Sequence, residues 1–380
     1  MKILMFVSVY FPSTMYGGPA TVAKMQAEEL VKRGNEVTII TTGVLSRKPF
    51  KQMTSEIIEE NGVIIRYFKL NNKPKRFSYF YSEEMMSWLK ANIYSFDLCH
   101  IHYGREINPI LIASIFNKFN KPYVLQTHGM LNSNNIIKKT IDKFIVTKQL
   151  KNAENCLVLQ EHEQKRIKSI QPKAKVKIMP NGIKVSDKII WNSENLTKKN
   201  ILFLARLHPR KKVLNFIRMA EILSYTDSNF QFRIVGPDGG ELEEAKKLTE
   251  ELNLSNVNFI GEISNMNTDE EYLDASVYVL PSFNEPFPMS VIEALKLGTP
   301  TIITNTTQNM DLLKSYDAVF ITDGTPEELS NAVLKIINNQ VLASKLSRNG
   351  NKLITECLNI EKVVEDLSKL YVEKTEVSEI

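Results

Sequence analysis

Cysteine is scarce in this chain, and long apolar runs are missing. Three cysteines, Cys99, Cys156 and Cys357, are scattered over 380 residues. An odd number of distant thiols suggests neither a disulfide framework nor a cysteine zinc site, and it is typical of the reducing cytoplasm. No apolar stretch reaches the roughly 18 residues of a membrane-spanning helix. We therefore interpret the apolar start, MKILMFVSVYFP, as a first strand rather than a signal peptide.

Three familiar signatures of nucleotide chemistry are absent as well. The sequence has no GxGxxG fingerprint, no GxxxxGK[ST] loop and no DxD pair. Dinucleotide dehydrogenases and P-loop phosphotransferases therefore lose support. Without paired carboxylates to hold Mg²⁺, fixed cations would have to neutralise a leaving phosphate. We expect no metal ion and no cofactor.

The net charge is a modest +5, but it is unevenly distributed. Residues 1–183 hold 27 Lys and Arg against 14 Asp and Glu, a net of +13, whereas the rest holds 21 against 29, a net of −8. Two stretches, 71–82 and 136–154, carry much of the basic excess. A solvated polar surface and a surface for an anionic membrane or acceptor both explain them. Nucleic acid is not expected, because no nucleic-acid-binding motif accompanies the charge.

Apolar runs of strand length alternate with helical patterns twice along the chain. This alternation predicts an α/β protein with two Rossmann-like domains, each a doubly wound parallel sheet covered on both faces. We expect a polar link at 180–200 and a cleft lined by the loops that follow the strands. The predicted strands are 2–10, 36–42, 63–69, 97–103, 122–128, 155–160, 200–207, 230–236, 257–262, 275–282, 299–305 and 318–323.

Several loops after these strands carry residues that suit an anion. Gly17 and Gly18 precede a helix and let backbone amides approach a phosphate, although a tight turn alone also explains them. Arg206 and Lys211 border a short loop and could clamp a diphosphate, or they could belong to a basic surface loop. His128 ends a strand and could project into the cleft, or it is an ordinary satisfied polar residue.

Two further motifs receive a structural interpretation. His100 and His102 alternate along the strand HIHY and could begin a metal site, but no third ligand follows at metal spacing. We therefore interpret both histidines as ordinary strand residues. The stretch IVGPDGGELEE, residues 234–244, places glycines just past a strand and predicts a turn and a helix cap.

Two glutamates, Glu285 and Glu293, follow a buried strand in NEPFPMSVIEAL. A helix that begins near Pro288 loses no intrahelical hydrogen bond there, and the amides of Met289 and Ser290 could face a phosphate. Glu293, one turn inside, could accept hydrogen bonds from the vicinal hydroxyls of a ribose, and Glu285 from a second polyol. An exposed loop glutamate and a surface helix glutamate explain the same spacing.

In this order the motifs resemble glycosyltransferase family 4, the retaining glycosyltransferases of GT-B architecture. The E-x7-E motif from Glu285 to Glu293 carries the resemblance, which covers the chain from end to end. The GG loop, THG at 127–129, PNGI at 180–183, ARLHPRKK at 205–212, GPDGGEL at 236–242 and GTP at 298–300 accompany it. The resemblance implies an acceptor-side domain at 1–183, a nucleotide-sugar domain at 184–360, and a C-terminal helix at 361–380 that crosses back to the first domain.

The resemblance also implies an activity and roles for residues. It implies retaining, metal-independent transfer of a hexose-like sugar from a nucleotide diphosphate sugar, a UDP-sugar foremost. Both glutamates are then binding groups, not the acid and nucleophile of a glycosidase. Catalytic roles fall to Glu285, His128, Arg206 and Lys211. Donor contacts fall to Gly17, Gly18, Arg206, Lys211, Glu285, Phe287, Met289, Ser290 and Glu293.

The sugar and the acceptor stay open. Many family members have glycine at the positions of Pro288 and Lys212, and these departures leave the donor sugar undecided. The basic first half suggests a polyprenyl-linked or growing surface glycan as acceptor, with the protein either in the cytoplasm or peripheral at the inner face of the cell membrane. Two alternatives remain, a nucleotide-sugar epimerase of the same architecture and a non-catalytic nucleotide-sugar-binding subunit.

Overall fold

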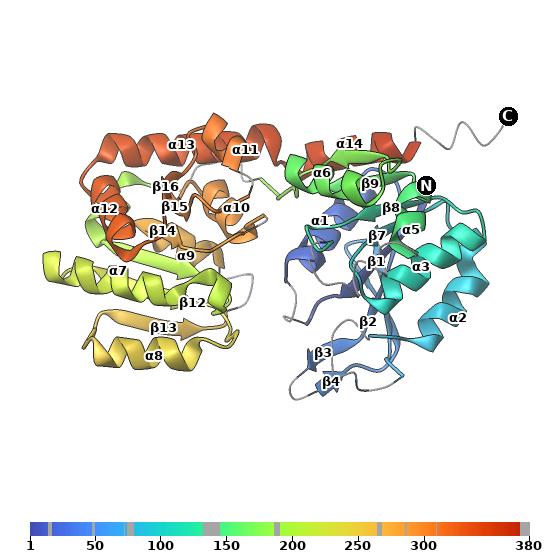
Figure 1. Ribbon diagram of the computed structural model, residues 1–380, viewed down its shortest axis with the longest axis horizontal. Helices are drawn as coiled ribbons and strands as arrows, with labels where there is room; N and C mark the ends of the chain where they lie inside the picture. Colours follow the sequence, from blue (N-terminus) through green and yellow to red (C-terminus); the bar gives the residue numbers. More distant parts are fainter. Residues whose placement is uncertain are drawn as a thin grey trace. The chain divides into compact units, whose positions relative to one another are not determined.

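The chain folds into two compact α/β units, seen in a computed structural model (Figure 1). The first unit comprises residues 1–184 together with the segment from residue 360 onward, and the second comprises residues 185–359. The structure describes residues 1–13, 17–47, 50–71, 73, 80–131, 145–185, 191–263, 268–285, 287–308 and 310–372.

The first unit is built on an eight-stranded sheet of order β10-β9-β8-β7-β1-β2-β6-β5. All six strands predicted for this half of the chain are confirmed. Its strands are β1 (Lys2–Val9), β2 (Glu36–Thr42), β5 (Glu56–Glu60), β6 (Val63–Phe68), β7 (Leu98–His102), β8 (Tyr123–Gln126), β9 (Asn155–Val158) and β10 (Val176–Ile178), with a separate ribbon of β3 (Val44–Arg47) and β4 (Phe50–Gln52). Its helices are α1 (Gly17–Lys32), α2 (Glu83–Asn92), α3 (Ile107–Lys118), α5 (Thr147–Asn152), α6 (Glu161–Ile170) and α14 (Ile360–Val372).

One strand departs from the predicted parallel sheet. β5 pairs antiparallel with β6 at the sheet edge, whereas the other strands of this sheet pair in parallel. Its sequence, EIIEE, is exposed along nearly its whole length. Because neither face of β5 is buried, its side chains lack the apolar pattern by which a strand is predicted.

Helices cover both faces of the first sheet. One apolar cluster joins the sheet to α2, α3, α5 and α6, and another joins its opposite face to α1 and α14. From α14 the side chains of Val364, Leu367 and Tyr371 enter the second cluster. The C-terminal helix is therefore part of the core of the first unit, although the whole second unit precedes it in sequence.

The second unit has a fully parallel six-stranded sheet of order β13-β12-β11-β14-β15-β16. Its six strands confirm those predicted. They are β11 (Asn200–Leu204), β12 (Gln231–Val235), β13 (Val257–Gly261), β14 (Val277–Leu280), β15 (Thr301–Thr304) and β16 (Phe320–Thr322). Its helices are α7 (Val213–Thr226), α8 (Leu242–Glu251), α9 (Thr268–Asp274), α10 (Met289–Lys296), α11 (Met310–Ser315), α12 (Pro326–Ile337) and α13 (Gln340–Cys357).

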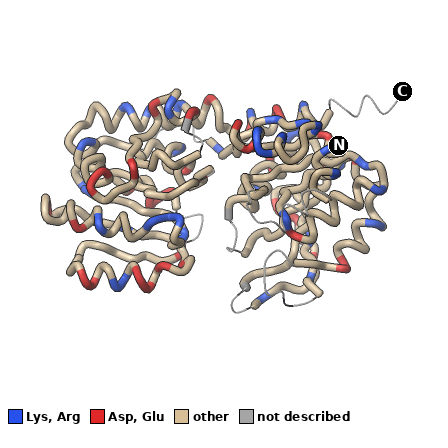
Figure 2. The backbone as a smooth tube through the Cα atoms, viewed as in Figure 1, with Lys and Arg blue, Asp and Glu red and all other residues tan. Residues whose placement is uncertain are grey.

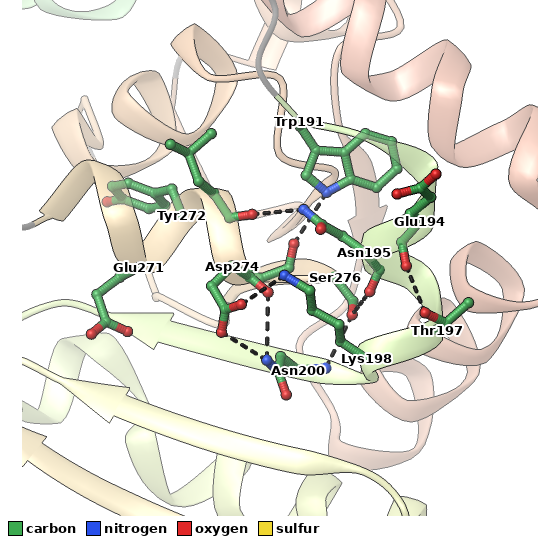
Figure 3. A network of polar contacts seen from close by, with 12 residues as sticks. Trp191, Glu194, Asn195, Thr197, Lys198, Asn200, Glu271, Tyr272, Asp274 and Ser276 are labelled. Carbon is green, nitrogen blue, oxygen red and sulfur yellow. Dashed lines mark hydrogen bonds and ion pairs between the residues drawn. The ribbon is translucent and has the colours of Figure 1, made fainter.

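A polar network anchors the entry of the chain into the second unit (Figure 3). Trp191 Nε1 donates to the Ala275 carbonyl oxygen at 3.1 Å, and the Asn195 amide donates to the Leu273 carbonyl oxygen at 2.6 Å. The backbone amide of Asn200, at the start of β11, donates to Ser276 Oγ at 3.0 Å. These bonds satisfy polar groups at the amino ends of β11 and β14, and the loops described next follow the opposite, carboxyl ends of these strands.

Candidate functional site

The strand order of the second unit reverses between β11 and β14. The loops after these two strands leave the sheet in different directions, and such a switch point is where open α/β sheets bind ligands. The loop after β11 carries Arg206 and Lys211, and the loop after β14 carries Glu285. A backbone hydrogen bond from the Phe283 amide to the Arg210 carbonyl oxygen, 2.8 Å long, joins the two loops. The fold thus brings the loop of Arg206 and Lys211 next to the loop of Glu285, although Arg206 and Glu285 are almost 80 residues apart in sequence.

Local backbone geometry shapes the basic loop 206–212. Residues Pro209–Lys211 form a short 3₁₀ turn, and His208 Nδ1 accepts a hydrogen bond from the Arg210 amide at 3.2 Å. Lys212 follows with a φ of 56°, the left-handed region that favours glycine. Glycine, which the family resemblance implies at this position, would adopt this angle without strain.

The GPDGG motif packs against the same loop. A Cβ added to Gly239 would lie 2.8 Å from Arg206 Cγ, so the arginine stem lies directly over this glycine. Asp238 Oδ1 accepts hydrogen bonds from the amides of Gly240 and Leu242 at 2.7 and 3.2 Å. The turn predicted from the sequence is therefore confirmed, but the first amide of α8 is satisfied by Asp238 and not by a glycine, since the N-cap residue is Glu241. Gly239 also makes room for a predicted site residue.

Lys211 and Glu285 form a buried ion pair. Lys211 Nζ donates to Glu285 Oε2 at 2.6 Å, and the two side chains are only 14% and 7% exposed. Arg210 approaches the other carboxylate oxygen at 3.6 Å. A carboxylate and an ammonium group are thus desolvated together at the switch point, where their mutual attraction is stronger than in water.

The basic loop carries four cationic side chains, those of Arg206, Arg210, Lys211 and Lys212; Lys and Arg are blue in Figure 2. Burial lowers the pKa of Lys211, Glu285 opposes this, and Arg210 and Arg206 lower the pKa further. Burial also lowers the pKa of His208, and the same three cations add to the effect. The positive charges of this loop repel one another, which lowers these pKa values, and the same charges attract an anion to the loop.

Glu293 lies on the first helix after the β14 loop. Helix α10 begins at Met289, so Pro288 stands just before the helix in extended conformation rather than inside it. Glu293 Oε2 accepts a hydrogen bond from Tyr272 Oη at 3.3 Å. Burial, partly offset by Lys296, raises the pKa of Glu293 to about 7.

The other residues of this segment that were predicted to contact the sugar donor lie around the start of α10. Tyr278 Oη donates to the Leu204 carbonyl oxygen at 3.1 Å and lies 2.8 Å from Ser290 Oγ, and this hydrogen bond holds the serine against β14. Phe287 is buried, and Met289 is partly exposed. The structure therefore places Glu285, Phe287, Ser290 and Glu293 around one strand-to-helix connection.

Gly17, Gly18 and His128 belong to the first unit. Helix α1 begins at Gly17, and a Cβ added to Gly18 would meet no atom within 4 Å, whereas residues 14–16 of the GG loop lie outside the described residues. His128 follows β8 with a φ of 48°, and Gly129 has a φ of 72°. The THG sequence therefore forms a left-handed turn just past the carboxyl end of a strand.

A buried glutamate that the sequence did not point out holds this turn. Glu163, on α6, accepts hydrogen bonds from Thr127 Oγ1, from the Gly129 amide at 2.6 Å and from the Leu159 amide at 2.8 Å. The side chain fixes the turn on both sides of His128, because its partners precede and follow that residue. No sequence signal marks Glu163, since it approaches from a different helix.

Three histidines form a row in the first unit. The rings of His100 and His102 stack with centroids 4.9 Å apart, and those of His102 and His128 stack at the same distance. His100 and His102 lie in the predicted strand, but describing them as ordinary strand residues misses the contact of His102 with His128. Among the described residues no three His, Cys, Asp or Glu side chains gather as metal ligands would.

Comparisons with known proteins cover nearly the whole chain. Residues 16–187 match the family description "Glycosyltransferase Family 4", and residues 186–353 match "Glycosyl transferases group 1". An uncharacterized glycosyltransferase of Methanocaldococcus jannaschii is 25% identical over 98% of both chains. An Escherichia coli UDP-Gal:alpha-D-GlcNAc-diphosphoundecaprenol alpha-1,3-galactosyltransferase is 27% identical over 52% of this chain and 54% of its own. The structure of Anabaena HepE in complex with UDP and glucose superposes with a TM-score of 0.74, at 15% identity, over 97% of this chain and 98% of that chain.

Proposed function

Because this chain belongs to the retaining group 1 glycosyltransferases of family 4, with the GT-B fold, we propose that it moves a sugar from a UDP-sugar to a glycan or lipid-linked acceptor. Transfer from a nucleotide-sugar is the activity of the family. The UDP donor, the acceptor class and the residues that act are our proposal. The bound UDP of HepE and the UDP-galactose and diphosphoundecaprenol in the name of the E. coli relative support it.

One observation carries the residue assignment. The Lys211–Glu285 pair and its neighbouring arginines lie at the switch point of the second sheet, at the carboxyl ends of β11 and β14. Breaking the glycosyl–phosphate bond builds negative charge on the departing phosphate. Arg206 and Lys211 stabilise that charge without reorganising, because the fold already holds their loop in place. Lys211 is shared between Glu285 and the diphosphate when the donor binds.

The two glutamates bind the two sugars of the donor. Glu293 accepts hydrogen bonds from the ribose hydroxyls, and the amides at the start of α10 approach the diphosphate. Glu285 orients the transferred sugar as it becomes oxocarbenium-like. The leaving phosphate helps to deprotonate the acceptor on the same face of the sugar, so the anomeric configuration is retained. Gly17, Gly18 and His128 of the first unit stay predicted contributors to the same reaction.

The donor panel is the direct test of this function. Purified protein is incubated with UDP-, GDP- and ADP-sugars in the absence of acceptor, and free nucleotide is measured. We expect slow release from a UDP-sugar, and about a hundredfold slower release in Arg206→Ala, because the variant loses one fixed cation at the leaving group.

The controls separate this function from its two rivals. Arg218→Ala removes an exposed cation on α7 and should leave the release rate unchanged. Isomerised donor in place of free nucleotide would indicate an epimerase. Tight donor binding with no turnover, even when undecaprenyl-diphosphate glycans are added, would indicate a binding subunit and contradict the proposal.

An anionic membrane surface is the proposed place of the acceptor. No helix in the described part of the chain is both long and apolar enough to span a bilayer. Residues 72, 74–79 and 136–144 of the basic stretches 71–82 and 136–154 lie outside the described residues, but Lys148 and Lys151 of α5 belong to the second stretch and are exposed. Attachment would therefore be electrostatic and at the surface of the bilayer.

Vesicle flotation tests this attachment. We expect the protein to float with vesicles that contain phosphatidylglycerol and to stay behind with pure phosphatidylcholine, and we expect salt to reverse binding. Replacing Lys148 and Lys151 by glutamate should weaken flotation, whereas the same charge reversal at Lys247 and Lys345 of the second unit should not. Equal behaviour with both kinds of vesicle would contradict a membrane role.

A further inference from the structure

The row of histidines in the first unit is hydrogen-bonded as well as stacked. His102 Nδ1 and His128 Nε2 are 2.7 Å apart, and the two rings are within 7° of parallel. Behind them, His100 Nδ1 lies 2.5 Å from the hydroxyl of Tyr371, which reaches the row from α14. The strands explain this arrangement, since residues two apart on β7 face the same side and β8 runs beside it in register.

All three imidazoles are neutral near pH 7. Burial lowers the pKa of His100 to about 4, that of His128 to about 3, and that of His102 well below its usual value. A neutral imidazole has one N–H and one bare nitrogen, so His102 and His128 share a single proton in their hydrogen bond. Two arrangements are possible, with either ring as the donor.

The second nitrogen of His102 decides between the two arrangements. His102 Nε2 is buried and has no hydrogen-bond partner among the described residues. If His128 donated, this nitrogen would carry a buried N–H with no acceptor, which is the rarer kind of orphan in proteins. If His102 donates from Nδ1, Nε2 is a bare nitrogen instead. The second arrangement is therefore the more stable one.

We propose that His102 is a positioning residue that donates from Nδ1 to His128 Nε2 and thereby keeps the proton of His128 on Nδ1. His128 can then act only as a hydrogen-bond donor, toward a hydroxyl or a developing negative oxygen, and not as a general base through Nδ1. The mechanistic part of this proposal rests on the proposed transferase function. The tautomer itself does not.

Labelled imidazole spectra test the tautomer directly. The chain has five histidines, so ¹⁵N-histidine spectra of the full-length protein can be assigned by single substitution. We expect His128 to show a protonated Nδ1 and a bare Nε2. His102→Leu should return His128 to the Nε2–H form that free imidazole prefers, whereas His102→Asn should not, because the asparagine amide nitrogen takes the place of Nδ1.

Kinetics give the second readout. We expect His102→Leu to lower kcat for sugar transfer about tenfold or more with little change in the KM for the donor, and His102→Asn to restore most of it. Tyr371→Phe is the matched control, since it removes one hydroxyl from the row without touching the bond to His128, and should alter neither readout.

The spectra and the kinetics together distinguish failure of the tautomer proposal from failure of the proposed transferase function. An Nε2–H signal for His128 in the unmodified protein would overturn the proposal, whether or not transfer is observed. Equal loss of kcat in His102→Leu and His102→Asn would also overturn it. The expected spectra in a protein that transfers no sugar would uphold the tautomer and refute the transferase function alone. If His102→Leu does not fold, the unmodified protein and His102→Asn still decide the tautomer.

Discussion

Lys211→Met should lower kcat/KM for sugar transfer about a thousandfold and also destabilise the second unit. The catalytic loss follows from the removal of a fixed cation at the leaving phosphate and from the release of Glu285, which Lys211 holds at 2.6 Å. The stability loss follows because the Glu285 carboxylate then stays buried with Arg210, 3.6 Å away, as its remaining cation. We expect a loss of up to about 3 kcal/mol in the free energy of unfolding.

A double-mutant cycle separates the two effects. Glu285→Gln alone leaves Lys211 buried without its carboxylate and should also destabilise the unit. The double variant Lys211→Met/Glu285→Gln removes both charges, so it should recover much of the stability but none of the activity. Urea unfolding and initial rates provide the measurements, with Arg218→Met as the control for loss of a cation elsewhere on the unit. Additive stability losses, or a kcat/KM within tenfold of the unmodified protein, would refute the assignment of this pair.

Glu293→Gln should stabilise the protein and impair donor binding. Burial raises the pKa of Glu293 to about 7, whereas the carboxyl of an unfolded chain titrates near its usual value of about 4.3. Between these two values the folded protein holds a proton that the unfolded chain has released. The stability of the unmodified protein therefore falls as pH rises through this window and levels off above it.

Glutamine has no such titration. The gain in unfolding free energy of Glu293→Gln over the unmodified protein should be near zero at about pH 4 and should reach at most about 4 kcal/mol at about pH 8. Urea unfolding across this range measures it. A gain that is independent of pH would show that burial of this carboxyl is not the cause.

Donor affinity should change in the opposite sense. A ribose donates two hydroxyls to the carboxylate form, so the affinity of the unmodified protein for UDP should rise as pH passes through about 7. Glu293→Gln should bind about ten- to a hundredfold more weakly above that pH, because hydrogen bonds to a charged acceptor are lost. Calorimetric titration with a UDP-sugar, whose phosphates do not titrate in this range, is the measurement. Stability and function thus oppose each other at this residue.

The sequence predicts the parts of the fold that follow from burial. The central parallel strands β1, β7, β8, β14 and β15 are almost fully buried and appear in the sequence as apolar runs, so the sequence predicts them. β5 and β10 are mostly exposed, and β3 and β4 are short, so their apolar pattern is weak and they are missed. The packing of α14 against α1 cannot be predicted from local pattern, because it joins segments more than 300 residues apart.

Local sequence pattern also predicts only part of the candidate site. The sequence proposes Arg206, Lys211, Glu285 and Glu293 as site residues because each lies in the connection after a strand or inside the next helix. The contacts that tune them come from other elements. Tyr272 reaches Glu293 from α9, and Glu163 reaches the His128 turn from α6. Their importance depends on strand order and side-chain direction, which local pattern does not contain.

The membership of α14 in the first unit makes the core of that unit depend on the last helix to be synthesised. Residues 185–359 form one uninterrupted stretch, so the second unit has all its residues once position 359 has left the ribosome. The first unit, although translated earlier, still lacks Val364, Leu367 and Tyr371 at that moment, and the apolar face of α1 waits for them. During translation this face is exposed to chaperones and to neighbouring nascent chains while the second unit is being made. The half of the chain that is synthesised first thus depends for its complete core on the helix that is synthesised last.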